Sequence, residues 1–102
     1  MTDASNKFSW IGVDICKAAL DVHVLPGGES SQYKNTANGI GAFIADLKTL
    51  GSVHVVFEAT GGLERSLASA LQTAGIPLTM ANPRQIRAFG IVLGKAKTAA
   101  LD

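Results

Sequence analysis

The chain has 102 residues, enough for one domain with one modest hydrophobic core. A composition of 47% hydrophobic and 17% charged residues, with a net charge of +1, fits an ordinary globular domain and excludes a strongly basic or acidic protein. No apolar stretch reaches the length of a membrane span, and the polar segment 1–7 predicts a flexible tail rather than a secretory signal. Cys16 is the only cysteine, which excludes an internal disulfide and a cysteine-based zinc site, so we expect a cytoplasmic protein.

Five strands and four helices are predicted in chain order from the spacing of apolar residues and from turn signals. The predicted strands are 8–15, 20–25, 31–36, 52–58 and 76–81. The predicted helices are one capped by Asn38 and running through Leu50, one at 63–73 capped by Thr60, one starting at Asn82-Pro83, and one starting at Lys95.

This order predicts an α/β domain over residues 8–102, with a mixed five-stranded sheet flanked by helices. The first three strands are expected to form an antiparallel meander, because a turn signal at 26–29 joins the second strand to the third. Crossover helices place the fourth and fifth strands parallel to the first.

Two of the predicted strands carry a carboxylate at or next to their last residue. The apolar runs 10–13 and 53–57 are typical of central strands buried on both faces, and they lead into Asp14 and Glu58. A carboxylate in such a position is costly unless it is paired, hydrogen-bonded or bound to a metal. If the two strands are neighbours, the acids lie together at the carboxyl ends, where open α/β sheets place their ligands. Structural roles are equally open: Asp14 could cap its turn, and Glu58 could accept hydrogen bonds from the backbone at 60–62.

A local basic segment follows the predicted fifth strand, with no acid before Asp102. Its members are Arg84, Arg87, Lys95 and Lys97. Two interpretations are open, contact with phosphate groups and a solvated helix face. His23, His54 and Lys17 are interpreted as structural or solvent-facing residues.

Four motifs resemble those of one family, in that family's order. Residues 11–17 resemble its opening G-(I/V)-D-(V/I)-x-K, and residues 56–62 resemble its E-(A/S)-T-G signature. Residues 82–89 resemble its N-P-x-x-(V/I)-(K/R)-x-F segment, and residues 95–102 resemble its terminal K-T-D-x-x-D signature. Together they make the chain similar to the N-terminal catalytic domain of DEDD-type insertion-sequence transposases, which include the Piv and MooV DNA invertases.

The resemblance implies an RNase H-like fold similar to the RuvC resolvase, and Mg²⁺- or Mn²⁺-dependent cleavage and exchange of DNA strands by the intact parent. It implies that Asp14, Glu58 and Asp102 are catalytic and metal-binding acids. Ala99 stands where the family has its third acid. Because a lost carboxylate weakens at least one metal position, we expect weak or absent cleavage by this chain.

The resemblance also implies partners. DNA is the first, contacted by the basic segment, and a structured guide RNA of the element is the second. Family members continue into a second domain with a serine nucleophile, so the chain is expected to be a C-terminally truncated fragment from a bacterial or archaeal cytoplasm. Self-association through the surface of the missing domain is open.

Two other functions stay open. One is a non-catalytic remnant that binds nucleic acid or self-associates, which Ala99 favours. The other is a fragment of a sugar-kinase or actin-like phosphotransferase, which shares the fold type and the G-x-D opening. That function needs a second domain to enclose ATP, and it leaves the segments at 82–83 and 97–98 without explanation.

Overall fold

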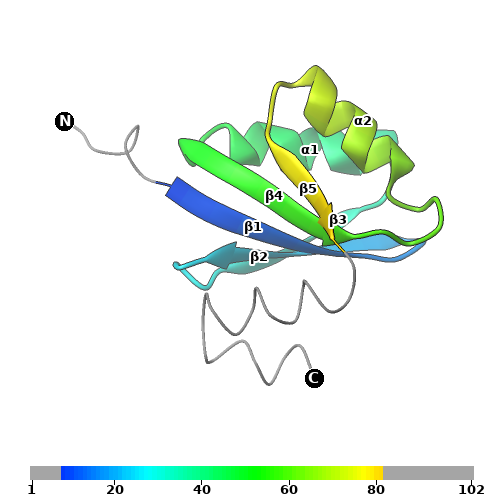
Figure 1. Cartoon of the computed structure of the whole chain (residues 1–102), viewed down its shortest axis with the longest axis horizontal. Helices are drawn as coiled ribbons and strands as arrows, with labels where there is room; N and C mark the ends of the chain where they lie inside the picture. Colours follow the sequence, from blue (N-terminus) through cyan, green and yellow to red (C-terminus); the bar gives the residue numbers. More distant parts are fainter. Residues whose placement is uncertain (1–7, 82–102) are drawn as a thin grey trace.

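The computed structural model describes residues 8–81, which form one sheet and two helices (Figure 1). The elements are β1 (Phe8–Ile15), β2 (Ala19–Leu25), β3 (Ser30–Lys34), α1 (Ala37–Leu47), β4 (Ser52–Glu58), α2 (Arg65–Thr73) and β5 (Leu78–Ala81). The helices predicted to start at Asn82 and Lys95 lie outside this range. Neither α1 nor α2 is long and apolar enough to cross a membrane.

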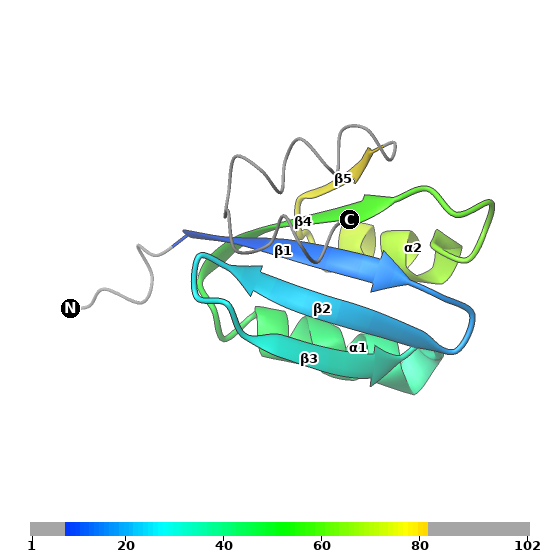
Figure 2. The ribbon, with the colours of Figure 1, turned by 90° about the horizontal axis from the view of Figure 1, so that it is seen from below.

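The strands lie in the order β3-β2-β1-β4-β5. β1 pairs with β2, and β2 with β3, in antiparallel fashion, while β4 runs parallel to β1 and β5 runs parallel to β4. Figures 1 and 2 show α1 and α2 on the same side of the sheet. The predicted mixed sheet, with its meander and two parallel crossover strands, is confirmed, and this arrangement is consistent with an RNase H-like fold.

The hydrophobic core fills the space between the sheet and the two helices. Period-two alternation in the strands supplies one side of it, and apolar residues at helical spacing supply the other. Its largest fully buried side chains are Phe43, Phe57, Ile11, Leu20, Leu67, Leu71 and Val55. The core therefore holds β1 and β4 together from the helix side.

The opposite face of the sheet is less uniformly covered. On β4, Val56 is buried while His54 and Glu58 are half-buried. On β1, Gly12 is half-buried and Asp14 is exposed. The prediction of strands buried on both faces holds best for the middle of β4, and it fails where β1 ends.

Both helices begin at other residues than predicted. The N-cap of α1 is Thr36, whose hydroxyl accepts a hydrogen bond from the Gly39 N–H at 3.1 Å, so the prediction of Asn38 as cap is wrong. The cap position of α2 is Glu64 rather than Thr60. Thr60 lies too far before Arg65, the first residue of α2, to cap the helix, and its hydroxyl donates to the Glu64 carboxylate.

Smaller differences concern the ends of elements. α1 ends at Leu47 rather than at Leu50, and α2 begins at Arg65 rather than at residue 63. β3 occupies Ser30–Lys34 and β5 begins at Leu78, so each is displaced or shortened by one or two residues relative to its prediction.

Candidate active site at the carboxyl ends of β1 and β4

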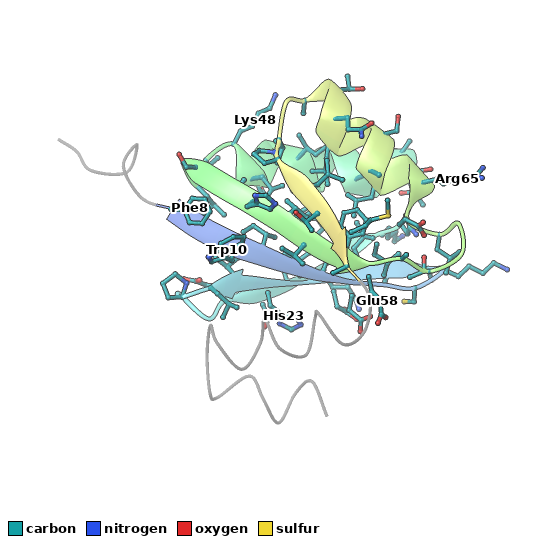
Figure 3. The ribbon with its side chains drawn as sticks, in the orientation of Figure 1. Phe8, Trp10, His23, Lys48, Glu58 and Arg65 are labelled. Carbon is teal, nitrogen blue, oxygen red and sulfur yellow. The ribbon has the colours of Figure 1, made fainter. Side chains whose placement is uncertain are left out.

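Asp14 and Glu58 follow neighbouring positions on two parallel strands. The register of β1 with β4 pairs Gly12 with Val56 and Val13 with Phe57, and each acid is the next residue along its strand. Adjacent strands lie about 4.8 Å apart. Val13 and Phe57 belong to the core, so alternation directs both acids to the face away from the helices. Figure 3 shows Glu58 on that face, at the end of β4.

Both acids reach solvent. Asp14 is exposed and Glu58 is half-buried. Water can therefore solvate their charges, and the expectation that burial forces these carboxylates to find a partner is wrong for Asp14.

A third carboxylate, not anticipated from the sequence, lies on the next strand. Asp21 of β2 is the antiparallel register partner of Asp14, and its Oδ1 accepts a hydrogen bond from Gln32 Nε2 at 2.7 Å. Residues 8–81 contain no group of three His, Cys, Asp or Glu side chains that could hold a metal ion. Asp21 therefore adds negative charge beside Asp14 without completing a three-ligand cluster there.

The glycine-rich loop after Glu58 donates hydrogen bonds to the side chain of Glu64. Oε1 of Glu64 accepts hydrogen bonds from the Thr60 hydroxyl at 2.6 Å and from the N–H groups of Thr60 and Gly62, both at 3.1 Å. Gly61 and Gly62 have φ of 79° and 131°, a region that glycine enters without strain. These donors serve Glu64, so the structural alternative in which they bind Glu58 is wrong.

We expect Glu64→Gln to reduce the acid sensitivity of the fold. The hydrogen bond from the Thr60 hydroxyl, followed by those from the backbone N–H groups of Glu64, Thr60 and Gly62, lowers the pKa of Glu64 from 4.5 to about 2. A carboxyl with a lowered pKa stabilises the folded state above its ordinary pKa, and this contribution is lost as the pH falls from about 4.5 to about 2.

Thermal melting followed by circular dichroism at pH 6, 4 and 2.5 measures this effect. The melting temperature of the natural chain should fall more between pH 6 and pH 2.5 than that of Glu64→Gln. Glu29→Gln, at an exposed turn position, is the control and should melt like the natural chain. Equal acid sensitivity in the natural chain and in Glu64→Gln would contradict the stabilising role of the hydrogen bonds to the Glu64 carboxylate.

The other predicted residues divide into two groups. His23 Nδ1 lies 3.0 Å from Ser30 Oγ, and His54 Nε2 lies 2.7 Å from Thr79 Oγ1, so both histidines have partners within the sheet. Lys17 is exposed. The second group comprises residues outside the described range, and its members are Arg84, Arg87, Lys95, Lys97, Ala99 and Asp102.

Comparison with known proteins identifies the family. A search of curated proteins found no match. The family model of DEDD transposases of the IS110 type, described as transposase, matches residues 11–102. The chain belongs to this transposase family. The match covers all four motifs of the sequence analysis, indicates a transposase domain of an insertion element, and implies DNA as the substrate.

The donors at the candidate active site suit the divalent metal that DEDD transposases generally use. Mg²⁺ prefers oxygen ligands and is commonly held by one or two carboxylates together with water and substrate phosphates. Asp14 and Glu58 offer two carboxylates from adjacent strands, on a face that water reaches. Asp14 and Glu58 are therefore the residues that would hold such an ion at the ends of β1 and β4.

Proposed function

We propose that this chain is the catalytic-domain portion of a DNA transposase or site-specific recombinase, and that Asp14 and Glu58 bind the Mg²⁺ or Mn²⁺ ion used to cut DNA strands. The observation that carries the proposal is the parallel register of β1 with β4, which brings the two acids to the same end of neighbouring strands. Family membership supports it, because both acids fall within the matched segment.

Each group has a distinct task in this proposal. Asp14 and Glu58 bind and orient the metal from a rigid sheet, and Asp102, from the last family motif, contributes a further carboxylate. When bound, the ion supplies neutralisation of charge on the attacking and leaving oxygens of the phosphodiester. Arg84, Arg87, Lys95 and Lys97 bind DNA through its phosphates, which positions the nucleic acid without reading its sequence.

The proposal includes a loss of catalytic power. Ala99 stands where the family motif has an acid, so one carboxylate ligand is missing from the set. We expect this chain to bind metal weakly and to cleave DNA slowly or not at all, while an acid at this position restores binding.

A Mn²⁺ titration followed by paramagnetic broadening of the backbone amide signals tests the metal site. We expect broadening centred on Asp14 and Glu58, and stronger broadening at the same Mn²⁺ concentration in Ala99→Asp. Asp14→Asn should weaken the apparent affinity at least about tenfold, since even outer-shell substitutions at metal sites cost that much.

The matched control is Asp46→Asn, which removes an exposed carboxylate from α1 on the other side of the sheet. The backbone amide signals of this variant should broaden with Mn²⁺ as those of the natural chain do. Failure to find localised broadening at Asp14 and Glu58 in both the natural chain and Ala99→Asp would overturn the metal-binding role of these acids.

One alternative keeps support, the non-catalytic domain that binds nucleic acid, because Ala99 removes a carboxylate but no basic residue. DNA binding without cleavage, in Ala99→Asp as well as in the natural chain, would favour it. A phosphate-binding loop of the kinase type is disfavoured, since Glu64 already takes N–H donors of the glycine-rich loop.

A further inference from the structure

Asn35 links the two chain segments that follow the acids. Its side-chain Nδ2 donates hydrogen bonds to the carbonyl oxygens of Cys16 at 3.1 Å and of Leu63 at 3.3 Å. Cys16 lies in the β1–β2 turn just after Asp14, and Leu63 lies in the loop between Glu58 and α2. One amide group therefore holds both segments.

The backbone that carries this amide is itself fixed. On one side, Lys34 ends β3 in register with Ala19 of β2, and the Asn35 N–H donates to the Ala18 carbonyl at 3.0 Å. On the other side, Thr36 caps α1. An Asn side chain has two N–H donors on one planar nitrogen, which is what two acceptors on different segments require.

The acceptor in the second loop is fixed as well. Leu63 lies between Gly62 and Glu64, and the Glu64 carboxylate holds Thr60 and Gly62 through three hydrogen bonds. The hydrogen bond from Asn35 to Leu63 therefore reaches a loop that is itself held in place by hydrogen bonds.

This link lies just where strand pairing ceases to hold β1 against β4. The last pair in their register is Val13 with Phe57, immediately before the two acids. We propose that Asn35 is a positioning residue that fixes the separation of Asp14 and Glu58 by tying together the segments that follow them. This proposal rests on the proposed function, in which the two acids bind a metal ion at one site. Metal sites depend on neighbouring residues that hold the metal ligands in place.

The test compares three variants of the full chain. Asn35→Leu keeps the approximate size of the side chain but removes both donors, and Asn35→Ala serves if the leucine is not accommodated. Tyr33→Phe is the control, because it removes one hydrogen bond, from Tyr33 to Asp46 at 2.7 Å, that ties the neighbouring part of β3 to α1 rather than to the acids. Thermal melting establishes that the variants compared are folded at the temperature used.

Two readouts are measured, the Mn²⁺ affinity at Asp14 and Glu58 from paramagnetic broadening and the microsecond-to-millisecond exchange of the same amides by relaxation dispersion without metal. We expect the Asn35 variants to lose about tenfold in Mn²⁺ affinity and to gain exchange at both acids, whereas Tyr33→Phe does neither. An affinity loss no larger than that of Tyr33→Phe would overturn the positioning role and leave the metal site intact.

A natural chain that shows no Mn²⁺ binding at these acids would defeat the proposed metal site, and relaxation dispersion then decides the role of Asn35 alone. Exchange at Asp14 and Glu58 that appears only in the Asn35 variants would support positioning. Amides as rigid as those of Tyr33→Phe would refute it.

Discussion

Phe57→Ala is expected to lower the free energy of unfolding by about 3–5 kcal/mol. The Phe57 side chain is 0% exposed and is among the largest fully buried side chains of residues 8–81. It lies on β4 between its register partners Val13 of β1 and Met80 of β5, and it faces the helices. Removing the ring loses its burial and leaves a cavity that the paired strands can close only in part.

Chemical denaturation followed by circular dichroism measures this loss. A domain of this size has about 5–15 kcal/mol of stability in total, so the variant should be marginally folded at 25 °C. Phe8→Ala is the control within the same sheet, because Phe8 is 48% exposed. A loss for Phe57→Ala no larger than that for Phe8→Ala would show that the Phe57 ring does not stabilise the core.

Gly39→Ala is expected to destabilise the fold by about 1–3 kcal/mol, although alanine is the better helix former. A Cβ built at Gly39 would lie 2.7 Å from the carbonyl carbon of Lys34 and 2.9 Å from its nitrogen, and closer still to its oxygen. These are backbone atoms at the end of β3, so the contact is relieved only if α1 moves away from the strand. That movement would also disturb the cap of Thr36.

Gly41→Ala provides the control in the same helix. A Cβ at Gly41 meets nothing within 4 Å, so this substitution should gain up to about 1 kcal/mol from helix propensity. We expect denaturation to show that Gly39→Ala lowers the free energy of unfolding, whereas Gly41→Ala, only two residues away, raises it. If Gly39→Ala were also stabilising, the close approach of α1 to β3 would be wrong.

The strands that carry the acids could be predicted because their signals are local. β1 and β4 have the predicted bounds, since each is a run of β-branched or aromatic residues that ends near a turn. The cap of α1 was missed because Thr36 and Asn38 are both good capping types, and the choice depends on where β3 ends. The start of α2 was missed because the side-chain bond between Thr60 and Glu64 has no pattern of its own in the sequence.

The same distinction holds for the candidate site. The proximity of Asp14 and Glu58 follows from strand order and could be anticipated. Asn35 could not, because its two acceptors lie 19 and 28 residues away in sequence and are backbone oxygens that any residue type would offer. Asp21 could have been found by aligning the predicted hairpin, since a two-stranded register pairs it with Asp14.

The two faces of β1 and β4 separate the residues that stabilise the fold from the acids of the proposed metal site. Val13 and Phe57 point into the core, whereas the acids that follow them point to the opposite face and belong to no buried cluster. Under the proposed function, folding depends on positions 13 and 57, whereas DNA cleavage depends on positions 14 and 58 as well. A transposase that has lost these acids is therefore expected to keep producing a domain that folds.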